Sequence, residues 1–150
     1  MKKFLLFLLL FISSHSVIFS FDITPLFNEY LDKVLKISKP AANHKYIFIY
    51  MHDCGGTVST LRLASSKIIK SKKIKDVSLV FVSESSGVPD NVSKLLKLPN
   101  VYLDDIGGYN KMNLTPNRSG LVIVENKKVK DKKILTMKNY REIFKTLKTK

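Results

Sequence analysis

The chain has 150 residues, 45% of them hydrophobic and 25% charged, which suits one compact domain with one core and leaves no room for several domains. Its formal net charge is +14 at pH 7, yet its only arginines are Arg62, Arg118 and Arg141. Base recognition relies mainly on arginine, and the lysines are spread along the whole chain. The composition therefore favours a solvated lysine-rich surface over nucleic-acid binding. Weak attraction to anionic lipid or polysaccharide stays an alternative.

A targeting segment is expected at the N-terminus. Two lysines precede the unbroken apolar run Phe4–Ile12, and small polar residues follow it, which is the order of a secretory signal peptide. We therefore expect residues 1–20 to be a signal peptide. An uncleaved N-terminal anchor through residues 4–21 is the alternative, because a second apolar patch makes the stretch almost as long as the ~20 residues that span a bilayer. In either case the remaining domain, residues 24–148, is expected to be extracytoplasmic, either periplasmic or secreted.

The domain is expected to open with a helix from Thr24 to about Ser38. Thr24 suits the N-cap and Pro25 the first helical position, and apolar residues then recur at helical spacing. After a short linker comes the segment Lys45–Met51. Because this segment is apolar from Tyr46 to Met51, it predicts a strand that is covered on both faces, in the middle of the sheet.

A second helix is predicted from Thr57 to Ser71, with apolar residues on one face and lysines opposite. The apolar run Val77–Val82 predicts the next strand. Strand, helix and strand within so short a stretch indicate a right-handed parallel crossover. Shorter elements follow: a helix from Asp90 to Leu96, a brief strand near residues 100–103, and a loop with about one helical turn.

The C-terminal part predicts a hairpin and a last helix. The strand Gly120–Val124 turns tightly into a second strand at residues 129–135, and the two should pair antiparallel. Thr136 is expected to cap the final amphipathic helix. Its inward residues are predicted to be Met137, Tyr140, Ile143, Phe144 and Leu147.

Helix, strand, helix, strand, short helix, hairpin and helix is the layout of the thioredoxin fold. The segment Tyr46–Thr57, YIFIYMHDCGGT, resembles the strand and active-site turn of that superfamily, and Val101–Asp105 and Gly120–Lys127 resemble its later part. The chain is thus similar to the secreted and membrane-anchored thioredoxin-like proteins of bacteria over residues 24–148. The resemblance implies an α/β fold with a central mixed sheet and flanking helices.

The resemblance places Cys54, the only cysteine, at the position of the family's first catalytic cysteine. That residue attacks a disulfide from the start of a helix, where amides and the helix dipole favour the thiolate. Thr57 stands where the resolving cysteine is expected, so the usual two-cysteine cycle cannot run within one chain. The expected substrate-binding residues are Gly55, Gly56, Thr57 and Pro116.

Two further departures from the family bear on this site. The family has a cis proline immediately before its third long strand, and its spacing falls near Ser119, three residues after Pro116. The carboxylate of Asp53 would disfavour a Cys54 thiolate by like-charge repulsion, which a protonated His52 could offset.

Two other chemistries of a Cys54 site are disfavoured. His52 and Cys54 are spaced so that they could share a strand face, but two ligands without a third make a poor copper or zinc site, so neither a metal nor a cofactor is expected. Peroxide-reducing enzymes of this fold place a threonine three residues before the reactive cysteine, where this chain has Met51.

Two functions remain. In the first, the exported protein is a monothiol thiol-disulfide oxidoreductase, and its partners are protein or small-molecule thiols and disulfides of the cell envelope. In the second, it is a non-catalytic thioredoxin-fold module, and its basic surface or former active-site groove binds another envelope protein.

Overall fold

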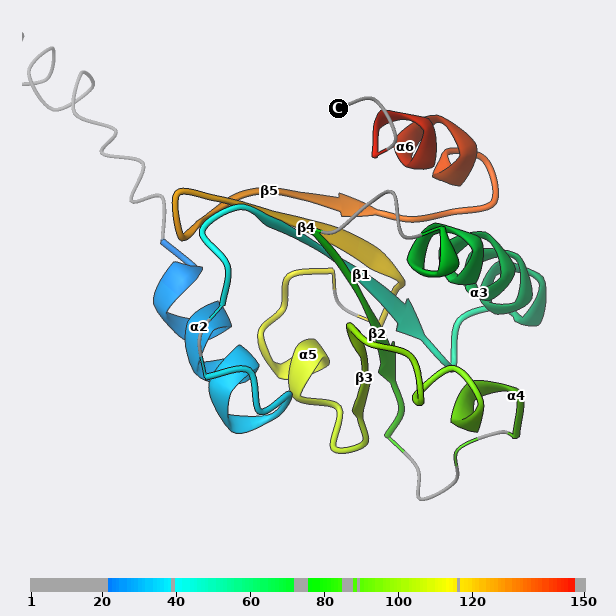
Figure 1. The fold of residues 1–150 in the computed structure, drawn as a ribbon, viewed down its shortest axis with the longest axis horizontal. Helices are drawn as coiled ribbons and strands as arrows, with labels where there is room; N and C mark the ends of the chain where they lie inside the picture. The colour runs from blue at the N-terminus through cyan, green and yellow to red at the C-terminus, as the bar shows by residue number, and fades with distance from the viewer. Residues whose placement is uncertain are drawn as a thin grey trace, which may run out of the picture.

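The computed structural model describes residues 22–38, 40–71, 76–84, 88, 90–115 and 117–147. They form one sheet covered by helices on both faces (Figure 1). The expected signal or anchor segment, residues 1–20, lies outside this description, as do Pro116 and residue 148. Among the described residues, no helix is both long and apolar enough to cross a bilayer. The elements are α2 (Thr24–Lys33), β1 (His44–Tyr50), α3 (Gly55–Lys70), β2 (Val77–Val82), α4 (Asp90–Ser93), β3 (Val101–Asp104), α5 (Gly108–Lys111), β4 (Gly120–Glu125), β5 (Lys128–Ile134) and α6 (Tyr140–Thr146).

The five strands lie in the order β3-β2-β1-β4-β5. Strand β2 is parallel to β1 and β3, whereas β4 is antiparallel to β1 and β5. The predicted parallel crossover, the C-terminal hairpin and the central place of the first strong strand are therefore confirmed. Strand β1 is central because both of its faces are apolar: Ile47 and Ile49 pack on one side, Phe48 and Tyr50 on the other.

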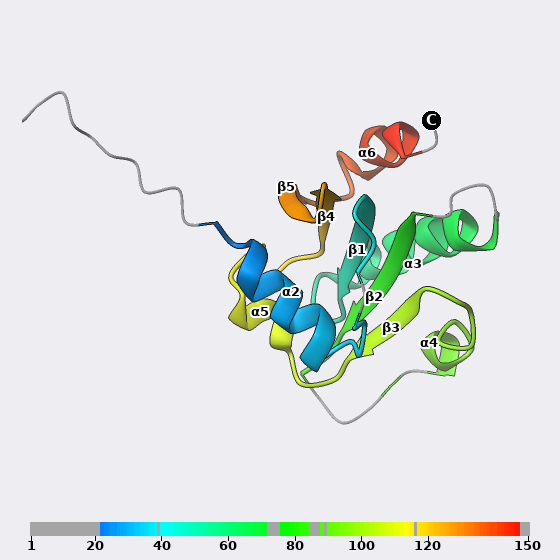
Figure 2. The ribbon, with the colours of Figure 1, turned by 60° about the vertical axis from the view of Figure 1, so that its left-hand side comes forward.

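Each face of the sheet has its own core, and Figure 2 shows α2 and α5 on one side and α3 and α6 on the other. Phe27 of α2 packs against Phe48 in the first core, and both side chains are 0% exposed. Leu61 of α3 and Phe144 of α6 belong to the second core. Burial of each such side chain stabilises the fold by about 1.5–3 kcal/mol. Helices therefore pack on both faces of the sheet, and this packing holds β1 and α3 in place relative to each other.

Helix α2 differs from the sequence-based prediction at both ends. The prediction of Thr24 as N-cap was wrong, because Ile23 is the N-cap and Thr24 lies inside the first turn. The Thr24 hydroxyl instead accepts the N–H of Val129 at 3.0 Å, which links the helix to β5. The helix ends at Lys33 rather than near Ser38, and Lys36 then has a left-handed φ of 59°, which no regular helix contains.

The last helix begins later than predicted. Thr136 and Asn139 form a reciprocal pair of hydrogen bonds, from the Thr136 N–H to Asn139 Oδ1 at 2.8 Å and from the Asn139 N–H to Thr136 Oγ1 at 3.3 Å. This turn makes Asn139 the N-cap, and α6 starts at Tyr140. The prediction of Met137 as a core residue was therefore wrong: it lies in the turn and is 48% exposed. Helix α4 is also shorter than predicted and ends at Ser93.

A buried carboxylate fixes α5 against α2. Asp104, at the end of β3, is 0% exposed and accepts the Tyr30 hydroxyl at 3.1 Å. It also accepts the N–H groups of Gly108 and Tyr109 at 2.9 and 2.7 Å. Burial, and then the charge of Asp104, raise the pKa of Tyr30. Since every oxygen of this carboxylate has a partner, the segment that leads toward β4 starts from a fixed point.

The same segment is fixed again just before β4. The Tyr109 ring stacks on Phe48 with centroids 4.1 Å apart, and its hydroxyl is hydrogen-bonded to Thr115. Gly120 passes so close that an added Cβ would lie 2.5 Å from the Tyr109 hydroxyl and 2.6 Å from Thr115 Oγ1. A side chain has no room there, so this position requires glycine. The close contact holds the backbone next to Ser119, the preceding residue.

Candidate functional site

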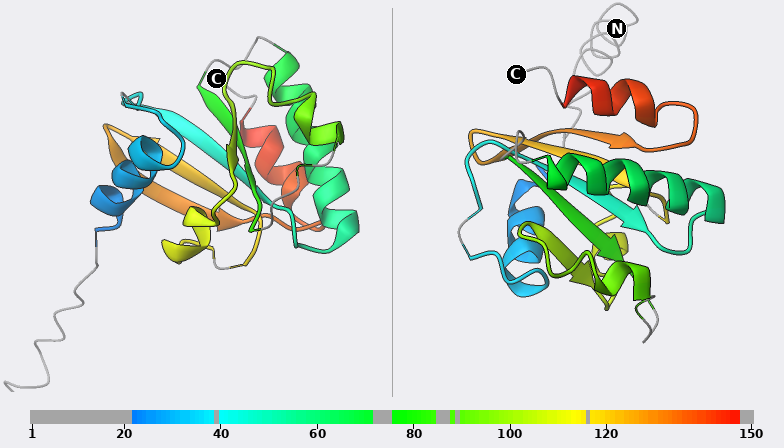
Figure 3. Two further views of the ribbon diagram at one scale, coloured as in Figure 1. Left: turned by 90° about the horizontal axis from the view of Figure 1, so that it is seen from below. Right: turned by 45° about the vertical axis from the view of Figure 1, so that its right-hand side comes forward.

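Cys54 lies where the chain passes from β1 into α3. The Met51 N–H donates to the Val82 carbonyl at 2.9 Å, which aligns the turn with the neighbouring strand β2. Cys54 is the N-cap of α3, with an extended backbone (φ −59°, ψ 138°), and its carbonyl accepts the Val58 N–H at 3.0 Å. The side chain is exposed. Figure 3 (left) shows the turn between this strand and helix at the edge of the sheet.

Thr57, one helical turn later, is the direct partner of the thiol. Its Oγ1 lies 3.0 Å from Cys54 Sγ, and the threonine itself is 6% exposed. The Thr57 side chain, followed by the N–H groups of Thr57 and Gly56, lowers the pKa of the Cys54 thiol, while desolvation and the charge of Asp53 oppose this effect. The residue at the resolving position therefore offers a hydrogen bond to the thiolate instead of a second sulfur.

The two glycines next to the thiol are exposed, and a Cβ added to either would meet no atom within 4 Å. Space for a ligand therefore lies beside Cys54, along the first turn of α3. The first N–H groups of any helix lack partners within the helix, and here those of Gly56 and Thr57 act on the Cys54 sulfur. Gly55, Gly56 and Thr57 thus lie together at the thiol, whereas Pro116 is outside the described residues.

Asp53 is turned inward, away from the open side of the site. Its side chain is 6% exposed, and Oδ1 accepts the Cys54 N–H at 2.9 Å while Oδ2 accepts the Ser119 N–H at 3.3 Å. The Arg118 guanidinium lies 3.8 Å from Oδ1. The carboxylate thus joins the turn before α3 to the loop before β4. This network was not foreseen from the sequence, in which Asp53 and Arg118 are 65 positions apart and share no motif.

Ser119 occupies the position immediately before β4, where the family's proline is expected. It is 0% exposed, its Oγ accepts the Tyr50 N–H at 3.1 Å, and its carbonyl accepts the Leu135 N–H at 2.9 Å. Its own N–H donates to Asp53, which a proline could not do. Over the described part of the chain, every peptide bond is trans. This loop is therefore held by hydrogen bonds to the Cys54 turn.

His52 is exposed, and its ring lies 5.5 Å from that of Tyr50. Within the described ranges, no group of three or more histidine, cysteine or acidic residues could hold a metal ion.

No family model matches the sequence, and no curated protein is significantly similar to it. Among solved structures, the solution structure of an uncharacterised thioredoxin-like protein from Porphyromonas gingivalis is similar at 20% identity and a TM-score of 0.48. The match covers 75% of this chain and 77% of that one. The order of helices and strands and the mixed sheet confirm the prediction made from the sequence. The chain has an α/β, thioredoxin-like fold, with a central mixed sheet and flanking helices.

Proposed function

We propose that this protein is an exported thioredoxin-fold protein in which Cys54 alone performs thiol-disulfide exchange in the cell envelope. The observation that carries the proposal is the state of the thiol. It is exposed at the start of α3, its sulfur lies 3.0 Å from Thr57 Oγ1, and that contact lowers its pKa. The thiolate is the nucleophile in exchange, so a lower pKa increases the reactive fraction at neutral pH.

The reaction has two exchanges. The Cys54 thiolate attacks one sulfur of a protein or small-molecule disulfide, which forms a mixed disulfide with Cys54 and releases the other half as a thiolate. An external thiol then attacks the mixed disulfide, becomes oxidised in the place of Cys54 and restores the free thiolate. No electrons are gained or lost in sum, because one disulfide is exchanged for another. Thr57 would donate its hydroxyl to the Cys54 sulfur whenever that sulfur is anionic.

The rate of alkylation of Cys54 by iodoacetamide, measured from about pH 5 to pH 10, tests the activated thiol. The inflection should lie below the free-thiol pKa of about 8.5. Thr57→Val, which keeps the shape but loses the hydroxyl, should move the inflection to higher pH. Thr57→Ser is the matched control and should leave it nearly in place. An inflection of the native protein at or above the free-thiol value would exclude an activated nucleophile.

Exchange itself is tested with glutathione disulfide and mass spectrometry. The native chain should form a mixed disulfide at Cys54 that added glutathione reverses, and Cys54→Ser should form none. Because the chain has one cysteine, the adduct needs no further assignment. Export is tested separately: a tagged full-length chain should lie outside the cytoplasm, and a chain without residues 1–21 should remain inside.

Ser119 favours a second candidate, a non-catalytic thioredoxin-fold module that binds another envelope protein. Its N–H and carbonyl both bond within the molecule, so Ser119 itself offers no free backbone group to an extended substrate. Cys54→Ser distinguishes the two candidates. If the variant retains the phenotype of the native protein in cells, while the thiol exchanges only slowly in vitro, the binding module is the better description.

A further inference from the structure

Strand β5 forms an open edge of the sheet and carries a row of lysines. Asp131 is the one acidic residue in this strand, and it pairs with Lys133 at 3.5 Å. Lysine is a common protection of edge strands against pairing with other chains. Here the hairpin turn, a neighbouring groove and the start of the domain indicate that these lysines also form a binding surface. The basic edge is defined by five exposed residues, Lys127, Lys128, Lys130, Lys132 and Lys133.

The basic edge is held in place at its hairpin turn. Asn126 and Lys127 form the turn with positive φ angles of 51° and 63°. The Asn126 N–H donates to Asn43 Oδ1 at 3.0 Å, and the Lys127 N–H donates to the Ala42 carbonyl at 2.8 Å. Since the turn is bonded to a loop outside the hairpin, the first lysines of the edge project from a fixed backbone.

An apolar groove lies directly beside these lysines. It has a volume of about 560 Å³ and lies between the start of α2, the end of α5 and β5. Leu26, on its wall, is 38% exposed. Lys130 and Lys132 also line the groove, together with Asn113 and with Asp131, which pairs with Lys133, so the polar side of this mainly apolar hollow carries two lysines that Asp131 does not pair with. The apolar residues that line it are Ile23, Leu26, Met112 and Val129.

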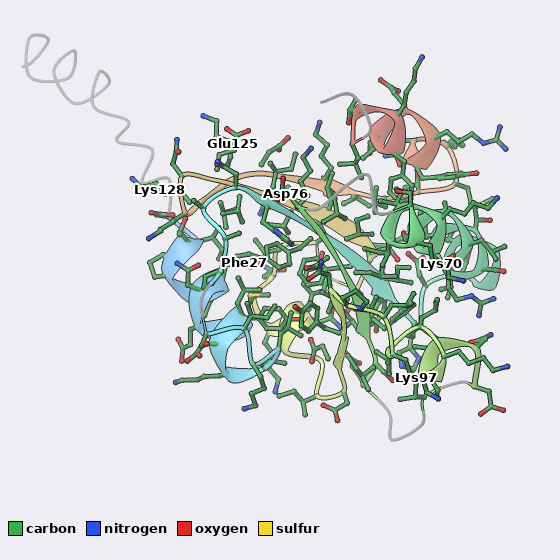
Figure 4. All side chains as sticks on the ribbon, in the orientation of Figure 1. Phe27, Lys70, Asp76, Lys97, Glu125 and Lys128 are labelled. Atoms are coloured by element: carbon green, nitrogen blue, oxygen red, sulfur yellow. The ribbon has the colours of Figure 1, made fainter. Side chains whose placement is uncertain are left out.

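The basic edge also lies next to the point where the apolar N-terminal sequence joins the domain. Thr24 accepts the Val129 N–H at 3.0 Å, and Lys128 is among the charges that act on Asp22. Asp22 and Thr24 are two residues apart, so at most about 7 Å of chain separates them. This distance is less than the Debye length of about 8 Å at physiological salt, so charges on the basic edge act at the start of the domain. Figure 4 shows Lys128 at this end of the molecule and Lys70 and Lys97 on the other side.

We propose that the basic edge and the adjoining groove dock the domain on the surface of an anionic phospholipid bilayer. The lysines would contact lipid phosphates, and the groove would receive an apolar part of a lipid at the interface. Charge and position together favour this occupant: five lysines and an apolar hollow lie beside Asp22 and Thr24, and the sequence that precedes Asp22 is mainly apolar over residues 4–12 and 17–21. This docking is independent of the thiol chemistry proposed above.

Docking would leave the thiol accessible. The hairpin turn lies beside the amino end of β1, because His44 pairs with Val124 of the hairpin. Cys54 follows the carboxyl end of β1, which spans seven residues or about 20 Å. The docked domain would therefore present Cys54 away from the hairpin end of the basic edge. Failure of docking and failure of exchange are consequently separate results.

Co-sedimentation with vesicles tests the proposal. The test uses the chain from Asp22 onward, so that the apolar N-terminal sequence cannot itself bind vesicles, and circular dichroism first establishes that this domain is folded. It should bind vesicles of phosphatidylglycerol and phosphatidylcholine, bind pure phosphatidylcholine much less, and lose binding as salt rises. Each lysine near an anionic surface contributes about fivefold to partitioning. The edge variant should therefore bind at least about 100-fold more weakly; it combines Lys127→Gln, Lys128→Gln, Lys130→Gln and Lys132→Gln.

A charge-matched control removes four exposed lysines elsewhere. This control should keep most of the binding, although it loses the same net charge. Equal losses in the two variants would overturn the proposal, because attraction would then follow net charge and not this surface. Circular dichroism of both variants establishes that they are folded. The control combines Lys67→Gln, Lys70→Gln, Lys94→Gln and Lys97→Gln.

Tryptophan fluorescence tests the groove without removing any charge, because the chain has no tryptophan. Leu26→Trp should shift to shorter emission wavelength on anionic vesicles. Leu63→Trp is the matched control, since Leu63 is 56% exposed beside another groove, between α3 and α6, and should not shift. A shift only at Leu63, or full competition by soluble glycerol phosphate, would overturn docking on a bilayer. Tight binding to dextran sulfate with no shift of Leu26→Trp on vesicles would indicate a soluble polyanion instead.

Discussion

Ser119→Ala removes one acceptor from a fully buried place and should destabilise the protein. Ser119 is 0% exposed, and its Oγ accepts the Tyr50 N–H at 3.1 Å. Alanine fits the same space but leaves that N–H without an acceptor, and water has no access to replace it. The Ser119 N–H remains and can still donate to Asp53. The change therefore isolates one hydrogen bond between β1 and the loop before β4.

A buried donor left without a partner costs about 1–3 kcal/mol. Unfolding in urea has a slope of about 1–3 kcal/mol per M for small proteins, so the midpoint should fall by about 1 M. The slope itself should stay constant, because the surface exposed on unfolding hardly changes. The rate of Cys54 alkylation in the folded protein should also stay constant, since the contacts of the thiol are retained.

Urea unfolding followed by circular dichroism measures this effect on the domain that begins at Asp22. Ser59→Ala is the matched control, because Ser59 is exposed on α3 and its loss leaves no buried donor. Its midpoint should equal or slightly exceed that of the native domain, since alanine favours helices. If Ser119→Ala and Ser59→Ala had the same midpoint, the Tyr50–Ser119 bond would contribute nothing, and the reasoning would be refuted.

Three further predictions concern packing, pH and the thiol. Gly120→Ala should cost about 1–3 kcal/mol in calorimetry, because its Cβ would meet two hydroxyls at 2.5 and 2.6 Å, whereas Gly56→Ala, in open space, should cost nothing. Burial lowers the pKa of His44 from 6.5, so the unfolded chain takes up the proton first. Stability should therefore be complete above about pH 6.5 and decrease as the pH falls toward the lower folded value; His44→Gln should flatten this profile, and an unchanged profile would contradict it. Thr57→Cys should oxidise to a disulfide with Cys54 within one chain, seen as loss of alkylation without dimers; disulfide-linked dimers would speak against the geometry.

Much of the fold could be predicted from short-range patterns of apolar and turn residues in the sequence. The segment around Ile47 is apolar at every position, a pattern typical of a strand that is covered on both faces. The hairpin follows from two strands joined by a short turn at Asn126. The helix ends were less predictable because distant residues decide them. The Thr24 hydroxyl accepts an N–H of β5 instead of one from its own helix, and Thr136 pairs with Asn139 before α6 begins.

The candidate site was predictable to the extent that it is local. Cys54 and Thr57 lie one helical turn apart, so their contact follows once a helix is placed after the cysteine. The role of Asp53 was not predictable, because its partner Ser119 lies in the loop before a strand that pairs only in the folded sheet. The sequence indicated a carboxylate beside the thiol, and the fold directs it inward to bind that loop.

The inward carboxylate also bears on which disulfides could react with Cys54. An extended protein substrate would need free backbone groups on the loop that faces the thiol, since strand-like pairing uses N–H and carbonyl groups. At Ser119 the N–H already donates to Asp53 and the carbonyl already accepts the Leu135 N–H. A small disulfide needs no such pairing, and the space beside Gly55 and Gly56 is open. Under the monothiol proposal, this arrangement favours low-molecular-weight disulfides over protein segments, so glutathione disulfide should react with Cys54 faster than an extended peptide that carries the same mixed disulfide.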